Sequence, residues 1–166
     1  HLLNNLINNS TIIIPLLNGM KHYELLAKKN ILTATIGGVN ASRNDDKLSV
    51  INKNTLIDLS LEKKSLTKNL VSLIDLVDIK FKIHYSDKYV LWNKLARLSV
   101  VSLITAISNS NLGHIRGDKN LFKQMNLLID EISILLNVLK ISIKKNEIIT
   151  QINNMPDNLE TSLQRD

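Results

Sequence analysis

A single lysine stands among apolar residues in the stretch from Tyr89 to Ala106, whose pattern is typical of one long helix. Each helical residue advances about 100°, which places Val101 and Thr105 about 20° from Lys94, and Ser102 about 80° away. Lys94 therefore heads a face that also carries hydroxyl groups. A lysine held at the wall of a cleft can donate a hydrogen bond or a proton to a substrate oxygen.

The same spacing allows a purely structural role for Lys94. A lysine often lays its aliphatic stem along the core and keeps its ammonium group in water. Under the chemical interpretation, Trp92 and Leu95 are buried, and Lys94 faces a cleft between a strand-rich first half and a helical second half. Asn18 is then expected across that cleft, within a substrate's width of Lys94. The spacing alone leaves both interpretations open.

The composition is that of a folded protein without an obvious macromolecular ligand. The chain has 166 residues, 44% of them hydrophobic, and a net charge of +6. Its 21 Lys and Arg residues are scattered, and the two Phe, three Tyr and one Trp form no stacking series, so the charge does not predict a nucleic-acid partner. We expect neither a membrane span nor a secretory signal, and therefore a cytoplasmic protein.

The first half alternates strand and turn signals. A β-branched run at 10–16, the Asn18-Gly19 turn, a short helix at 21–29 and a strand at 31–36 together predict one half of a βαβ unit. Two further strands are predicted at 47–51 and 56–61, separated by a hairpin-like break at 52–54. An amphipathic helix at 62–76 and an alternating strand at 79–83 follow.

The second half is predicted to be helical from residue 88 to residue 166. We expect breaks only at 109–118 and around Pro156, with Asp118 as the N-cap of a helix over 121–140. The domain boundary is placed near residue 86. The predicted fold class is thus an α/β part in residues 1–86, followed by an all-α part in residues 87–166.

The glycines and histidines limit the kinds of site that the chain can build. None of the five glycines belongs to a G-x-G-x-x-G or P-loop motif, and Gly37-Gly38 lacks the third glycine and the helix that cradle a pyrophosphate. The four histidines have no H-x-x-x-H or H-E-x-x-H spacing, so no metal site is predicted. The chain by itself cannot form the usual phosphate turn of a dinucleotide site.

Two motifs, in the right order and at the right distance, resemble the ketopantoate reductase (2-dehydropantoate 2-reductase) family. The segment 91–96, Leu-Trp-Asn-Lys-Leu-Ala, resembles the W-x-K-L motif that supplies the family's catalytic lysine, and 17–20, Leu-Asn-Gly-Met, resembles its later N-G-[ML] turn. The likeness runs from about residue 11 to residue 164. It implies that Lys94 is catalytic, that Asn18 contacts both nicotinamide and substrate, and that Ala41 lies near the cofactor.

Several positions depart from the family pattern. Leu98 and Ser102 stand where the family has asparagine, and Leu112 occupies a third such position, with Asn111 one place away. Ser102 and Asn111 stay candidate substrate ligands, and either Thr161 or Ser162 would replace the family's substrate-binding serine. Leu98 cannot form a hydrogen bond, so part of the substrate clamp is expected to be lost.

The resemblance implies NADPH-dependent reduction of a 2-oxo acid, most specifically of 2-dehydropantoate to pantoate in pantothenate biosynthesis. It also implies that the chain begins after the glycine-rich part of a Rossmann domain and stops before a catalytic glutamate, so we expect the isolated chain to bind NADP weakly and to be inactive. The alternative is a reductase-like module that has lost its chemistry and serves interaction or dimerisation. A homodimer is compatible with both hypotheses.

Overall fold

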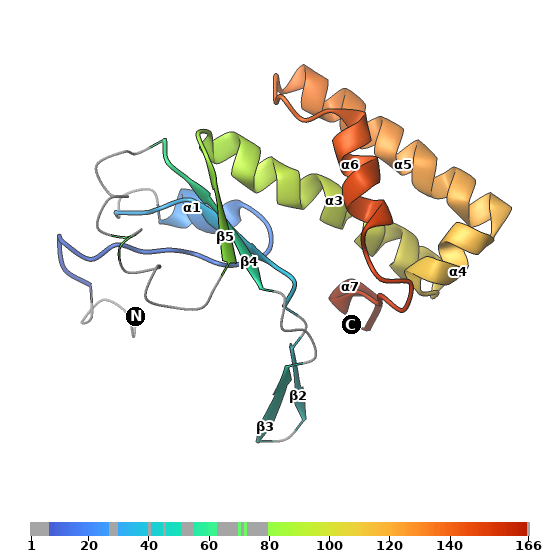
Figure 1. The fold of residues 1–166 in the computed structure, drawn as a ribbon, viewed down its shortest axis with the longest axis horizontal. Helices are drawn as coiled ribbons and strands as arrows, with labels where there is room; N and C mark the ends of the chain where they lie inside the picture. Colours follow the sequence, from blue (N-terminus) through green and yellow to red (C-terminus); the bar gives the residue numbers. More distant parts are fainter. Residues whose placement is uncertain are drawn as a thin grey trace. The chain divides into compact units, whose positions relative to one another are not determined.

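The computed structural model describes residues 7–26, 30–39, 41–44, 46–50, 55–62, 70, 72 and 80–165. The chain divides into two compact units, His1–Leu91 and Trp92–Asp166. The strands lie in the first unit, whereas the second is built from helices (Figure 1). This order confirms the predicted fold class, an α/β part followed by a helical part.

A three-stranded mixed sheet forms the centre of the first unit. It consists of β1 (Ala34–Gly37), β4 (Leu56–Ser60) and β5 (Lys80–His84), in the order β1-β4-β5. The central strand β4 runs antiparallel to β1 and parallel to β5. Leu32, Ala34 and Leu59 form the buried core of this unit. Burial of these apolar side chains is the main term that stabilises so small a sheet.

The predicted βαβ half-unit is present in a reduced form. Ile13 forms an isolated parallel bridge with Ile31. The Ile13 N–H donates to the carbonyl of Asn30 at 2.8 Å, and the Leu32 N–H donates to the carbonyl of Ile13 at 3.0 Å. Helix α1 (Lys21–Leu25) lies between the two extended segments in the chain. The parallel direction is as predicted, but the pairing is one bridge long.

Tyr23 ties α1 to the sheet. Its hydroxyl donates to the carbonyl of Ala34 at 3.1 Å and accepts from the Ala34 N–H at 3.0 Å. The side chain thus completes the hydrogen bonds of a strand residue, as a neighbouring strand would. Burial raises the pKa of Tyr23 above its ordinary value, so the neutral hydroxyl persists.

The predicted strands at 47–51 and 56–61 exist, but their hairpin-like pairing is wrong. Strand β3 (Lys47–Val50) pairs with β2 (Ala41–Asn44) in a separate two-stranded ladder (Figure 1). The reason is that both edges of β4 are already occupied, by β1 and by β5. The helix predicted at 62–76 lies outside the described residues, except for Glu62, Leu70 and Ser72.

The second unit contains more breaks than the sequence analysis expected. Five helices are described after β5, and they are α3 (Asp87–Ser108), α4 (Leu112–Gly117), α5 (Lys119–Val138), α6 (Lys145–Asn153) and α7 (Ser162–Arg165). Helix α4 lies inside the predicted break at 109–118. A further break separates α5 from α6, where continuous helix was predicted. The break around Pro156 is confirmed.

Local caps explain where the helices begin and end. The Asp118 carboxylate accepts from the N–H groups of Asn120 and Leu121 at 2.8 and 2.9 Å, which confirms Asp118 as the N-cap of α5. After α5, Lys140 adopts a φ of 56°, and the Ile141 N–H donates back to the carbonyl of Leu136. This left-handed residue turns the chain away from the helix axis and ends α5.

Helix α3 is 22 residues long and apolar enough, by length and composition alone, to cross a membrane, which the sequence analysis did not expect. Inside the protein, 39% of its most apolar window is buried. Asn93, Lys94 and Thr105 are among its buried residues, and its side chains form hydrogen bonds with other parts of the second unit. These are the properties of a core helix.

Candidate active-site face on helix α3

Two caps fix the start of α3, and with it the position of Lys94. The Ser86 hydroxyl accepts from the Tyr89 N–H at 3.2 Å, as an N-cap does. The Glu62 carboxylate accepts from the Asp87 N–H at 2.8 Å. Negative charge at this end also interacts favourably with the helix dipole. The helix therefore starts at a defined residue, and Lys94 follows two turns later.

Lys94 lies on the buried face of α3. Its side chain is 7% exposed, and Val101 and Thr105, which share its direction, are 0% exposed. Trp92 and Leu95 are only half-buried, so the expectation that they are the buried pair was wrong. They lie about 160° and 100° around the helix from Lys94, outside the stripe of α3 residues that packs into the core. The lysine and a hydroxyl thus share the most protected face of this helix.

A polar bridge holds the turn that carries Lys94 against α6. The Gln151 amide donates from Nε2 to Asn93 Oδ1 at 2.7 Å and accepts at Oε1 from Arg97 Nη1 at 3.0 Å. Asn93 is 8% exposed. Buried amides of this kind cost free energy unless they are satisfied, and here Gln151 satisfies Asn93 Oδ1 while Arg97 satisfies Gln151 Oε1. The bridge fixes the rotation of α3 about its own axis beside Lys94.

Thr105 joins the same face to the end of the second unit. Its Oγ1 lies 2.9 Å from Thr161 Oγ1, and both side chains are buried. Thr105 Oγ1 is also 2.8 Å from the carbonyl of Val101 and 3.3 Å from that of Ser102. The structure thus brings predicted residue Thr161 to the Lys94-bearing helix. Ser162, the other candidate, is exposed at the start of α7.

The predicted asparagine ligand has a structural task. Asn111 is exposed, and its Oδ1 accepts from the His114 N–H at 2.9 Å as the N-cap of α4. Its Nδ2 group donates no hydrogen bond to any of the described residues. Leu112, by contrast, is 0% exposed and belongs to the core. Leu98 and Ser102 are half-buried on the flank of the Lys94 face.

Gly113 allows the chain after α6 to approach α4 closely. A Cβ at this position would lie 2.7 Å from the Asp157 Cβ. The Gly113 N–H donates to the carbonyl of Asp157 at 2.8 Å, and the Leu112 N–H donates to that of Leu159 at 3.2 Å. Arg116 pairs with the Asp157 carboxylate and also donates to the carbonyl of Ile152 at the end of α6. These contacts place the segment that leads to Thr161.

Asn18 and Ala41, the two predicted site residues of the first unit, lie in a bend and at the start of a strand. Asn18 is exposed in a bend, and Gly19 after it has a φ of 78°, a conformation that suits glycine. Ala41 is the first residue of β2 and pairs with Val50. Both residues lie in the first unit, and each is positioned by the backbone around it.

A buried acid–base pair in the first unit was missed by the sequence analysis. His84 Nε2 lies 2.7 Å from Asp58 Oδ1, and both side chains are nearly buried. The Tyr89 ring packs against the His84 ring with centroids 5.1 Å apart. Only the parallel register of β4 and β5 brings these residues together, and no local pattern announces it. Among the described residues, no three His, Asp or Glu side chains are grouped as metal ligands would be.

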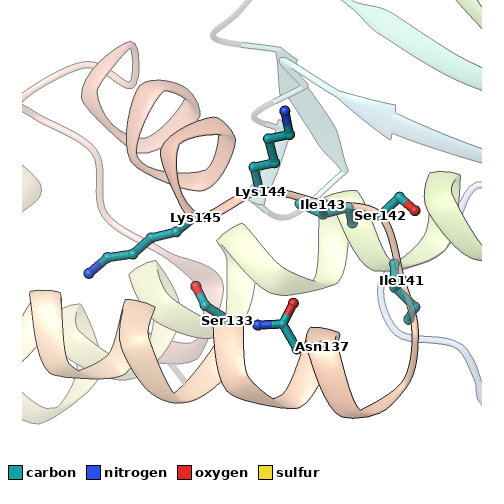
Figure 2. A pocket seen from close by; sticks show the side chains of 7 residues that line it. All are labelled: Ser133, Asn137, Ile141, Ser142, Ile143, Lys144 and Lys145. Carbon is teal, nitrogen blue, oxygen red and sulfur yellow. The ribbon is translucent and has the colours of Figure 1, made fainter.

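A shallow pocket of about 450 Å³ lies between α5 and the start of α6 (Figure 2). It is lined by Ser133, Asn137 and the run from Ile141 to Lys145, and none of these is a predicted site residue. The Ser133 hydroxyl donates to the carbonyl of Ile129, and Lys145 pairs with Asp130. Because the Ser133 hydroxyl and the Lys145 ammonium group already have partners within the protein, the pocket is a weaker candidate than the Lys94 face.

Comparison with known proteins rests on structure, because no protein-family model and no curated protein matches the sequence. The chain has the fold of ketopantoate reductases. A dimeric ketopantoate reductase from Staphylococcus aureus matches with a TM-score of 0.80 at 17% identity, over 96% of this chain and 55% of that one. The 2-dehydropantoate 2-reductase of Porphyromonas gingivalis W83 matches with a TM-score of 0.73 at 17% identity, over 90% and 55%.

A related dehydrogenase has the same fold. D-mandelate dehydrogenase in complex with NADH matches with a TM-score of 0.84 at 17% identity, over 98% of this chain and 58% of that one. The chain therefore spans about half the length of the structures that it matches. At such identity the likeness establishes the fold, which confirms the resemblance first noted in the two motifs.

Proposed function

We propose that this chain is part of an NAD(P)H-dependent reductase of 2-oxo acids, related to ketopantoate reductase. In this proposal residues 1–86 are the last part of a Rossmann-like domain, and residues 87–166 begin a helical substrate domain. The most specific form is NADPH-dependent reduction of 2-dehydropantoate to pantoate, on the route to coenzyme A, by a cytoplasmic homodimer. The dimeric state of the Staphylococcus aureus relative supports that last element.

One observation carries the proposal. Lys94 is buried on the same face of α3 as the Thr105 hydroxyl, in a chain of which 96% matches a ketopantoate reductase and 98% a D-mandelate dehydrogenase in fold. Burying a lysine costs free energy unless its charge is compensated, and Lys94 has an interaction partner within the protein. The W-x-K-L resemblance points to this protected lysine as the general acid beside a substrate carbonyl.

The residues present fit part of a nicotinamide dinucleotide. The exposed Asn18 amide, on a turn fixed by Gly19, can contact the nicotinamide, and the backbone at Ala41 lies at the start of a strand. The 166 residues hold no glycine-rich turn for the pyrophosphate. When bound, the cofactor supplies a hydride to the carbonyl carbon of the substrate.

The protein's own contribution is to hold the carbonyl and its proton. The Lys94 ammonium donates a hydrogen bond to the carbonyl oxygen and delivers a proton as alkoxide charge develops. General acid catalysis of this kind is worth about 10²–10⁴-fold. Asn18 orients the reacting carbonyl, while Ser102, the Asn111 amide group and a hydroxyl at 161 or 162 bind the other polar groups of the substrate.

A second function is favoured by the leucines on α3 and α4. Leu112 fills a core position where the family has a substrate-binding asparagine, and Leu98 is half-buried at another. A catalytically inactive, reductase-like interaction or dimerisation module would tolerate both changes. The retained Asn18 and Lys94 favour the enzyme, because a packing module needs neither.

Steady-state reduction of a panel of 2-oxo acids by the full-length protein tests the proposal. Loss of one hydrogen bond to a charged substrate group costs about 1.5–3 kcal/mol, so the affinity for ketopantoate should fall by about tenfold or more, and a more apolar 2-oxo acid should be preferred. Ketopantoate as the clearly best substrate would contradict the predicted specificity. A folded protein that consumes no NADPH with any acid would favour the interaction module.

A further inference from the structure

The Thr105 hydroxyl can donate one hydrogen bond, and two acceptors lie within reach of it. It lies 2.8 Å from the carbonyl of Val101, which can only accept, and 2.9 Å from the Thr161 hydroxyl, which can donate or accept. If Thr105 donates to Val101, then Thr161 must donate to Thr105. The opposite choice would leave the buried Thr161 proton without an acceptor among the described residues. Buried donors left unpaired cost about 1–3 kcal/mol, so the first arrangement prevails.

The direction of this hydrogen bond has a consequence for substrate binding. A Thr161 proton given to Thr105 cannot also be given to a substrate carboxylate. Ser162 is exposed, and its hydroxyl has no comparable tie in the described structure. The two neighbouring hydroxyls therefore have different tasks, although the sequence presents them as equal candidates.

The segment between α6 and α7 is held at two separate points. Near its start, the Asp157 and Leu159 carbonyls accept from Gly113 and Leu112 on α4. At its end, Thr161 meets Thr105 on α3. The hydrogen bond at this second attachment joins two side chains, on the face that also carries Lys94. Its removal should loosen the end of the segment and leave the start in place.

We propose that Thr105 is a positioning residue for the reaction, because its hydrogen bond with Thr161 fixes residues 161–162 beside the Lys94-bearing helix and reserves Ser162 for the substrate carboxylate. This inference rests on the proposed function and refines its substrate site. Thr105 itself touches no substrate. It acts by holding the Ser162 hydroxyl at a fixed distance from the face of α3 that carries Lys94.

The test compares Thr105→Val, which keeps the shape and removes the hydroxyl, with Thr105→Ser, which keeps the hydroxyl. In hydrogen exchange, Thr105→Val should speed exchange of the amides at 162–165 and leave those at 112–117 unchanged, whereas Thr105→Ser should resemble the wild type. In steady-state assays of the full-length protein, Thr105→Val should raise the KM for the 2-oxo acid about three- to tenfold, with kcat nearly constant.

Thr161→Val and Ser162→Ala separate the two tasks. Thr161→Val should reproduce Thr105→Val in both assays, and the double variant should add little, because both changes remove one interaction. Ser162→Ala should raise KM without changing exchange. An unchanged KM in Thr105→Val, or a KM effect of Thr161→Val without an exchange effect, would overturn the inference.

Failure of the proposed function is distinguishable from failure of the Thr105–Thr161 hydrogen bond to position residues 162–165. A wild-type protein that reduces no 2-oxo acid overturns the proposed function and the catalytic task of Thr105 together. The exchange measurement then still reports whether Thr105 holds residues 162–165. Equal exchange in the wild type and Thr105→Val would show that the hydrogen bond positions nothing.

Discussion

The two units hold their candidate residues by different means. Asn18 in the first unit is exposed on a turn, and its place depends on the backbone conformation of Gly19, with a φ of 78°. Lys94 in the second unit is 7% exposed, and its place depends on the packing of α3. A turn is a local device, whereas a buried helix face depends on the whole core around it. The structural effects of a substitution should therefore extend much further around Lys94 than around Asn18.

The largest effect is expected from the core beneath the Lys94 face. Ile104 is 1% exposed and Leu103, next to it, is 42% exposed. Ile104→Ala should lower the free energy of unfolding by about 2–5 kcal/mol, because it removes buried surface and leaves a cavity. Leu103→Ala should cost much less. Urea unfolding of both variants measures this, and equal costs would show that α3 is not held by that face.

A smaller cost is expected where α4 meets the segment after α6. Gly113→Ala would push a Cβ to within 2.7 Å of the Asp157 Cβ, whereas a Cβ at Gly117 meets nothing within 4 Å. Gly113→Ala should destabilise by about 1–3 kcal/mol. Gly117→Ala should be neutral or slightly stabilising, because alanine loses less entropy on folding. Thermal unfolding of the two variants compares them directly, and equal Tm values would contradict the close approach.

The turn in the first unit should respond weakly and locally. Gly19→Ala meets no atom within 4 Å but forces alanine to a φ of 78°. The cost should be about 1–2 kcal/mol, and Gly19→Asn should cost less, because asparagine tolerates the left-handed region. Hydrogen exchange should change near residues 18–20 and stay constant in α5. A change that reaches α5 would break the contrast between the two units.

The end of α3 and the end of α5 show why the sequence predicted some breaks and missed others. Both helices are followed by a residue with positive φ, Asn109 at 48° after α3 and Lys140 at 56° after α5. Asparagine is common in that conformation and marks the break in the sequence, but lysine does not. Helix α4 was missed because six residues are too few for a hydrophobic period.

The sequence predicted which candidate residues share one helix face, but it did not predict their partners in other elements. Helical periodicity placed Lys94 and Thr105 on one face, and both are buried there. The partner of Thr105 lies 56 residues further along the chain, and the His84–Asp58 pair spans 26 residues. Such contacts depend on how helices and strands pack, so spacing within one element cannot reveal them. The β2–β3 ladder pairs residues that are close in the sequence, and it was missed because no strand was predicted at 41–44.

The smallest predicted effect concerns pH and the start of α5. Hydrogen bonds from the N–H groups of Leu121 and Asn120 lower the pKa of Asp118 below its ordinary value of 3.8. Its capping contribution is therefore complete above that value and is lost as the pH falls through the lowered pKa. The Tm difference between wild type and Asp118→Ala should be constant from neutral pH to about pH 5 and then narrow. The control variant Asp118→Asn keeps an acceptor that does not titrate. If the Tm difference between wild type and Asp118→Ala did not narrow at low pH, the assignment of Asp118 as the N-cap would be contradicted.

The catalytic assignment of Lys94 is the central claim, and steady-state kinetics of Lys94→Ala in the full-length protein test it most directly. Lys88→Ala, at an exposed position of the same helix, is the matched control. If Lys94 donates its proton in the transition state, its loss should lower kcat by about 10²–10⁴-fold with a much smaller change in KM, while Lys88→Ala stays close to wild type. A loss confined to KM, or equal effects of the two variants, would contradict the assignment.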